Sequence, residues 1–169
     1  NYRYKNFPEL SYYAWIISEK VNEENRAAAA KESQRSSVGE AIGDKNVQAT
    51  YYWIYSPGDN ACMWDEFYDA EIMAIGWGEI GDLTAFATKD AMKQKMKECI
   101  DPTLSYKNAA HATWQFVNDM KPGDIVFVKK GMHRIVGRGI VTSDYIFDAS
   151  RRDEYKNIRQ INWTNKGEW

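Results

Sequence analysis

The chain has 169 residues and a formal net charge of −2, with 44% hydrophobic and 27% charged residues. This is the size of one globular domain with an appendage, and it leaves no room for an NTPase motor beside a second catalytic domain. No apolar run approaches the ~20 residues that span a bilayer, and the first 20 residues lack the apolar core of a secretory signal. We therefore expect a cytoplasmic protein without a membrane segment.

The aromatic content is high for a chain of this size. Seven tryptophans, 11 tyrosines and six phenylalanines make up 14% of the residues. A core of this size needs less ring surface than that, so we expect some of these rings to line a binding surface.

Charge is unevenly distributed along the chain. Residues 51–90 carry one basic residue against eight acidic ones, a formal charge of −7, whereas residues 121–169 carry ten against six, a charge of +4. The last third can therefore present a local basic face although the whole chain is weakly acidic.

Cysteine and histidine are too few and too scattered to suggest a metal centre. Cys62, Cys99, His111 and His133 lie far apart and form no CxxC or similar ligand pattern. We expect no metal and a reducing compartment, with both cysteines buried or inert and His133 as a polar turn residue.

Residues 1–48 are predicted to form a helical appendage and a linker. Within residues 10–21, apolar side chains recur with the i, i+3, i+4, i+7 spacing of one helix face; they are Leu10, Tyr13, Ala14, Ile17 and Val21. The Ala-rich stretch 23–32 also favours a helix, and residues 33–48 are predicted to be a linker.

The domain itself is predicted to span residues 49–169. The expected elements are a strand at 51–56, a helix at 61–70, a strand at 72–77, helices at 88–100 and 105–120, strands at 125–129 and 134–142, and a last strand at 158–163. Thr88 is the expected N-cap of its helix, and Gly137 and Gly139 predict a bulge or sharp bend in their strand. This order indicates an α+β domain with a curved mixed sheet or partial β-barrel and surrounding helices.

Familiar catalytic motifs are missing. The sequence has no P-loop, no GxGxxG between strand and helix, no GxSxG and no HExxH. Adjacent acids such as Asp65 and Glu66 are more typical of a solvated helix face. We therefore expect a binding domain, with no catalytic residue and no cofactor, rather than an enzyme.

Four ordered blocks of the sequence resemble an EVE domain, a member of the PUA-like superfamily related to YTH domains. The blocks are YYWIYSPGDNACMWDEFYDAEIMAIGWGEIGDL (51–83), WQFVNDMKPGDIVFVKKG (114–131), RIVGRGIVTSDYIFD (134–148) and YKNIRQINWTNKGEW (155–169). The chain is most similar in kind to the EVE-like N-terminal domain of McrB-type subunits in modification-dependent restriction systems. In those subunits an AAA+ GTPase motor follows, so this chain resembles their isolated specificity domain.

The resemblance implies a DNA-binding domain that recognises a modified, for example methylated, base. Such readers hold the base in an aromatic cage, and in a duplex the base must first be flipped out of the stack. The implied partners are modified DNA, the motor domain and a separate nuclease subunit. The sequence does not distinguish between 5-methylcytosine and 6-methyladenine as the recognised base. The alternatives are a reader of modified RNA, or a small-molecule-binding or protein-interaction domain.

The resemblance also points to the residues of a base pocket. Trp77 matches the tryptophan that follows the second strand in the YTH pattern, and its neighbours Gly76 and Gly78 would let a ligand approach the backbone. Tyr145 and Phe147 lie where the second wall of the pocket is expected. For all three rings the alternative is packing at a strand end.

Further candidates lie in and after the first strand. Ser56, Asp59 and Asn60 are candidates for contacts to the base edge, although Pro-Gly-Asp-Asn is also ordinary turn chemistry. Trp53 and Tyr55 alternate on one strand face and are candidates for the pocket floor, with the core as the stronger alternative.

Basic residues of the last third are candidates for phosphate contacts, the alternative being an ordinary solvated surface. They are Lys129, Lys130, Arg134, Arg138, Arg151 and Arg152. Among the other rings, Trp64, Phe67, Tyr68, Trp114, Phe116 and Trp163 are expected in the core.

Overall fold

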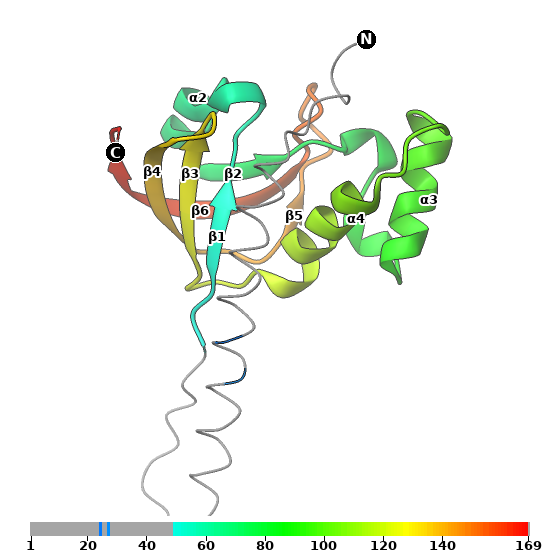
Figure 1. The fold of residues 1–169 in the computed structure, drawn as a ribbon, viewed down its shortest axis with the longest axis horizontal. Helices are drawn as coiled ribbons and strands as arrows, with labels where there is room; N and C mark the ends of the chain where they lie inside the picture. The colour runs from blue at the N-terminus through cyan, green and yellow to red at the C-terminus, as the bar shows by residue number, and fades with distance from the viewer. Residues whose placement is uncertain (1–23, 25–26, 28–48, 169) are drawn as a thin grey trace, which may run out of the picture.

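The computed structural model describes residues 49–168 of the chain, together with residues 24 and 27 (Figure 1). Apart from those two residues, the predicted appendage and linker at 1–48 lie outside the described part.

A single curled sheet forms the body of the domain (Figure 1). Its strands are β1 (Tyr52–Tyr55), β2 (Ile72–Ile75), β3 (Ile125–Lys130), β4 (Arg134–Val141), β5 (Ile146–Phe147) and β6 (Asn157–Lys166). The strand order is β1-β3-β4-β6-β2, with β5 also paired to β6. Only β1 and β3 pair in parallel; the other pairs are antiparallel. The sheet curls into a half-barrel, which confirms the predicted α+β class with a curved mixed sheet.

Helices pack at two places around this half-barrel (Figure 1). The elements are η1 (Asp59–Ala61), α2 (Trp64–Asp69), η2 (Gly78–Ile80), η3 (Leu83–Ala85), α3 (Lys89–Cys99), α4 (Lys107–Trp114) and the π-helical η4 (Gln115–Asp119). α2 lies at one end of the sheet, while α3 and α4 pair beside it. Thr88 caps α3 as predicted, because its hydroxyl accepts the Ala91 amide at 3.1 Å.

The helix predicted at 105–120 changes type part of the way along. α4 ends at Trp114, and the chain then widens into the π-helical η4, where the Met120 amide donates to the Gln115 carbonyl at 2.9 Å. The two-residue strand β5 is a second departure, since no strand is predicted at 146–147. It is too short for an alternation pattern to reveal it.

Two tryptophans explain the glycines of β4. The rings of Trp64 and Trp163 meet edge to face, with centroids 4.7 Å apart, inside the half-barrel. A Cβ at Gly137 would overlap the Trp64 ring, and one at Gly139 would overlap the Trp163 ring. The pairing of β4 shifts register beside Gly139 when it meets β6. The predicted bend is confirmed: the two positions without side chains let the rings lie against the strand.

The core has two parts. The larger cluster fills the half-barrel and includes Trp64, Phe67, Phe116 and Trp163, as predicted. A smaller cluster joins α3 and α4 to the segment after β2, and Met92, Met96, Leu83 and Tyr106 belong to it. Within the described residues, no helix is both long enough and apolar enough to cross a membrane.

Candidate nucleic-acid interface at the rim of the half-barrel

Three loops meet at one end of the half-barrel, and we call this end the rim. They are residues 56–63 after β1, residues 76–80 after β2, and residues 148–156 between β5 and β6. The third loop contacts the other two: the Gly78 amide donates to the Glu154 carbonyl at 3.1 Å, and the Tyr155 hydroxyl lies 3.0 Å from where a Cβ on Gly58 would be. Figure 1 shows the loop before β6 at the same end of the sheet as α2.

The hairpin between β3 and β4 joins the rim because of strand direction. β1 and β3 are parallel, with Tyr55 opposite Val128, so the segments that follow both strands leave the sheet at the same end. The Asn60 Oδ1 atom lies only 3.3 Å from where a Cβ on Gly131 would be. The topology thereby brings the predicted base-edge residues beside the predicted phosphate-binding hairpin.

Trp77 has an unusual backbone conformation. Its φ is 73° and its ψ is 20°, the left-handed region, which costs a bulky residue about 1–2 kcal/mol. The ring is half-buried and meets Tyr106 edge to face, with centroids 5.8 Å apart. Tyr106 is itself left-handed, at φ 49°. Such strain persists only where the surroundings impose it, and it is concentrated at functional sites.

The glycines beside Trp77 face the chain itself. A Cβ on Gly78 would lie 2.7 Å from the Glu154 carbonyl oxygen, and one on Gly76 would lie 3.7 Å from the Glu154 carboxylate. The 148–156 loop therefore occupies the space beside the backbone of these glycines, where we expected a ligand. Gly78 therefore lets this loop lie close beside Trp77, whereas the space at Gly76 would accept a Cβ in ordinary contact.

Tyr145 is tied into the structure by its hydroxyl. It donates to Asn157 Oδ1 at 2.7 Å and accepts the Leu83 amide at 3.0 Å. Burial raises the pKa of this hydroxyl above its ordinary value of 10.0. The Asn157 amide in turn donates to the Gly76 carbonyl at 3.0 Å. Tyr145 therefore supports the Trp77 loop through a buried asparagine.

Asn157 is a residue that sequence reasoning missed. It is fully buried at the start of β6 and links Tyr145 to the loop of Trp77. A single asparagine next to a predicted strand start carries no signal of such a role. Phe147 lies opposite Asn157 on β5 and is half-buried.

The other ring candidates lie in the core. Trp53 is buried, and its indole Nε1 donates to Asp124 Oδ2 at 2.8 Å. Tyr55 is buried as well, and its hydroxyl contacts the backbone of Ala74. Both side chains lie inside the half-barrel, as the stronger of the two sequence interpretations has it.

The predicted base-edge residues are exposed at the rim. The Ser56 hydroxyl donates to the Gly58 carbonyl at 3.2 Å. Asn60 is left-handed, at φ 52°, as is its neighbour Ala61 at φ 58°. Asn60 and Asp59 are both exposed, so their side chains are accessible from solvent next to the hairpin of β3 and β4.

Three predicted phosphate-binding arginines already contact other side chains. Arg151 forms ion pairs with Glu66 at 2.9 Å and Asp153 at 2.8 Å, Arg134 pairs with Glu168 at 3.2 Å, and Arg138 donates to the Thr164 hydroxyl at 2.9 Å. The Arg134–Glu168 pair is exposed, and such pairs contribute only about 0–1 kcal/mol, so a phosphate can compete for Arg134. The Arg151 side chain is only 18% exposed and is held by two carboxylates.

The lysines and the remaining arginine differ in exposure. Lys129 and Lys130 are half-buried at the end of β3, and Arg152 is exposed in the 148–156 loop. Burial lowers the pKa of the Lys129 ammonium below its ordinary value. Lys129, Lys130 and Arg134 thus lie at the β3–β4 hairpin, and Arg151 and Arg152 lie in the 148–156 loop. Arg138 lies farther along β4, opposite Phe127.

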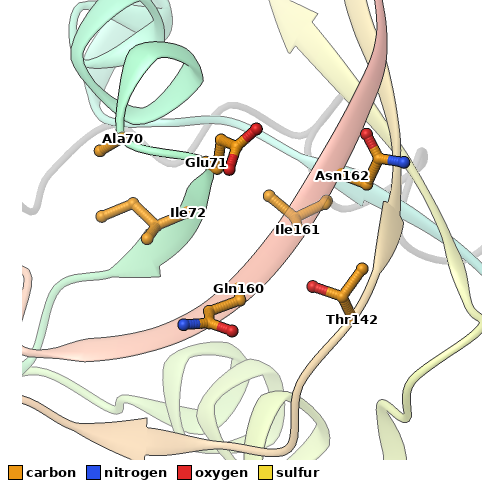
Figure 2. Close-up of a pocket in the computed structure, with 7 residues that line it drawn as sticks. All are labelled: Ala70, Glu71, Ile72, Thr142, Gln160, Ile161 and Asn162. Carbon is orange, nitrogen blue, oxygen red and sulfur yellow. The ribbon is translucent and has the colours of Figure 1, made fainter.

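A separate pocket of about 280 Å³ lies between the start of β2, the end of β4 and the middle of β6 (Figure 2). Its lining residues are Ala70, Glu71, Ile72, Thr142, Gln160, Ile161 and Asn162. None of the predicted site residues lines it. The lining offers a carboxylate, two amides and a hydroxyl without a cation, which is unsuited to a phosphate.

The cysteines correct one expectation. We expected Cys62 and Cys99 to be buried or inert; both are exposed, so burial is wrong for both. His133 is exposed in the hairpin turn, as expected. Among the described residues, no group of three or more histidine, cysteine or acidic side chains is arranged to hold a metal ion.

The fold and the rim define a class: a mixed α+β half-barrel that presents a loop-built polar and aromatic surface at one end. The chain belongs to the family DUF8426, described as a domain of unknown function, which matches residues 53–169. No curated protein matches the chain.

Proposed function

We propose that the domain binds DNA carrying a modified base, and that the base is flipped into a pocket at the rim around Trp77. The observation that carries this proposal is the half-buried Trp77 ring in a left-handed backbone conformation. A stacking ring contributes about 1–3 kcal/mol per base, which offsets much of the cost of leaving the stack. Phe147 is the proposed second wall, and Tyr145 positions the loop of Trp77.

Recognition of the base edge is assigned to the polar loop after β1. Asn60 can donate and accept hydrogen bonds, whereas ionised Asp59 only accepts, which suits an exocyclic amine. Ser56 completes this group. Lys129 and Lys130 support the assignment, because the hairpin that carries them lies beside Asn60 and supplies positive charge for the neighbouring phosphates.

The wider role follows from the resemblance of the sequence to McrB-type specificity domains. The domain would direct a modification-dependent restriction complex in the cytoplasm to modified foreign DNA. The GTPase motor and the nuclease would belong to other domains or subunits, and this domain would perform no catalysis itself.

A titration with matched oligonucleotides tests the proposal. Short duplexes that differ only in one base (unmodified, 5-methylcytosine or 6-methyladenine) are compared at fixed salt. We expect one modified duplex to bind at least 10-fold more tightly than its unmodified twin. Trp77→Ala should abolish that preference and Trp77→Phe should retain part of it. Trp114→Ala removes another half-buried tryptophan and should leave it unchanged.

The same titration separates the alternatives. Equal affinity for all duplexes would overturn the proposal. A preference for the modified base in an RNA strand over a DNA strand would favour the RNA reader. Absence of any salt-dependent affinity for nucleic acid would favour a small-molecule or protein ligand.

A further inference from the structure

The outer face of the sheet, the side away from the core of the half-barrel, carries rings and cations in rows. Residues opposite one another on adjacent strands form one such row, which we call the platform row: Ile54, Phe127, Arg138 and Asn165. Val126 and Val128 beside Phe127 are buried, so the row points outward. Its last three members and Ile135 line a hollow of about 390 Å³. The hollow therefore combines a ring and an aliphatic side chain with one cation and one amide.

A second ring lies diagonally from Phe127 on the same face. Tyr52 is opposite Ile125, two residues before Phe127 on β3, and it is 40% exposed. Paired strands lie about 4.8 Å apart and rise about 3.3 Å per residue, so the two ring positions are about 8 Å apart. Sheets that bind single-stranded nucleic acid present rings in this way to two or three successive bases.

The charge of the sheet is entirely positive. None of the six described strands contains Asp or Glu, although the chain has 24 acidic residues. Arg138 lies in the platform row, and its bond to the Thr164 hydroxyl at 2.9 Å holds the guanidinium in place. Lys129 follows Phe127 by two residues and lies opposite Ile135. A surface of rings and cations without carboxylates suits a polyanion that also presents apolar faces.

We propose that the outer face binds an unpaired DNA strand, with bases stacked on Phe127 and Tyr52 and phosphates at Arg138 and Lys129. This inference rests in part on the proposed function, since it uses two of the same phosphate-binding cations, but its rings form a second site. Bases in an intact duplex present no free π-face, so the strand must be unpaired. Stacking and phosphate contacts do not depend on base identity, so this face holds the strand without reading its sequence.

Binding of unmodified oligothymidine to the full chain at fixed salt tests the proposal. A strand of about 10 nucleotides should bind more tightly than a duplex of the same length. Phe127→Leu keeps an apolar side chain but removes the ring, and it should weaken binding of the strand about 5-fold or more. Phe86→Leu is the matched control and should leave the affinity unchanged, because Phe86 is also half-buried but packs on the smaller core cluster.

Photochemical crosslinking of the unsubstituted chain covers a failure of either variant to fold. Oligothymidine in which 5-iodouracil replaces thymine reacts on irradiation with a ring stacked on it, and mass spectrometry locates the bond. We expect the bond at Phe127 or Tyr52. Bonds only at other residues would overturn the proposal, as would equal affinities of Phe127→Leu and Phe86→Leu or the absence of a preference for the single strand over the duplex.

The result is separable from that of the proposed function. Trp77→Ala should leave the affinity for unmodified oligothymidine unchanged, whereas it should abolish the preference for a modified duplex. Loss of any base preference together with Phe127-dependent binding of the strand would contradict only the pocket around Trp77. A strand affinity that falls equally in Trp77→Ala and Phe127→Leu would overturn the site on the outer face.

Discussion

The hydroxyl of Tyr55 donates to the carbonyl oxygen of Ala74 at 2.6 Å and accepts the amide of the same residue at 3.0 Å. Tyr55 lies on β1 and Ala74 on β2, the two end strands of the sheet order. One side chain therefore satisfies both backbone groups of a residue where strand pairing stops. This contact closes the half-barrel and holds the loops after β1 and β2 at a common rim.

Tyr55→Phe should destabilise the domain by about 1–3 kcal/mol, because it leaves the buried amide and carbonyl of Ala74 without a partner. Denaturant unfolding measures the loss. Tyr68→Phe is the control, since Tyr68 packs at the edge of the same core, and it should change stability by less than about 0.5 kcal/mol. Equal stability of the two variants would mean that the Tyr55 hydroxyl does not close the sheet.

Substitution of Arg159 should destabilise the domain more than substitution of an exposed arginine. It is buried, and its guanidinium donates to the carbonyls of Phe116 at 2.9 Å, Ser143 at 2.9 Å and Val117 at 3.1 Å. Burial lowers the pKa of Arg159 from its ordinary value. Arg159→Met removes all three bonds and should cost about 3 kcal/mol or more, since the buried carbonyl of Phe116 and the partly buried carbonyls of Val117 and Ser143 each lose a donor.

A lysine cannot replace the planar fork of this arginine. Arg159→Lys should therefore recover only part of the stability, whereas Arg152→Lys at an exposed position should be neutral. Hydrogen exchange should become faster at 115–119 and 143–145, the segments that Arg159 joins. Unchanged exchange in Arg159→Met would show that the π-helical turn does not depend on this side chain.

The same arginine illustrates where sequence reasoning stops. Strand and helix periodicity placed most elements of the domain and the class of fold, because alternation and capping are local signals. The π-helical turn contacts a guanidinium 43 residues later in the chain. No local pattern encodes such a contact.

The candidate site shows the same limit. The left-handed conformation of Trp77 and the contact of its loop with Glu154 arise from tertiary packing. The proximity of Asn60 to the β3–β4 hairpin requires parallel pairing of strands about 70 residues apart. The sequence therefore offers candidate residues one at a time, whereas their mutual arrangement depends on the tertiary structure.

The loop at 148–156 should loosen in acid. The Arg151 guanidinium contacts both carboxylate oxygens of Asp153, at 2.8 Å and 3.2 Å, and lowers the pKa of that carboxyl below its ordinary 3.8. A carboxyl whose pKa is lower in the folded state stabilises the fold above its unfolded pKa, and this contribution is lost as the pH falls through the folded value. Because the pair is partly exposed, its contribution should stay below about 1 kcal/mol.

Carboxyl NMR titration measures this effect directly. Asp153 should titrate below 3.8, and Arg151→Gln should move its pKa back toward that value. Lys166→Gln provides the matched control: it should raise the lowered pKa of Asp65, whose carboxylate pairs with Lys166 at 2.8 Å, without affecting Asp153. An unchanged Asp153 pKa in Arg151→Gln would exclude the ion pair as its cause.

The lysines at the end of β3 should control how DNA affinity depends on salt. Each phosphate contact adds nearly one counterion to the slope of log affinity against log salt concentration, so Lys129→Gln and Lys130→Gln should each reduce that slope by about 1. Both substitutions should weaken the binding of modified and unmodified duplexes equally, since phosphates carry no information about the base. Lys95→Gln and Lys97→Gln on α3 change the net charge by the same amount outside the β3–β4 hairpin. If they reduced the slope as much as the β3 variants do, the basic hairpin would not be the surface that meets the DNA backbone.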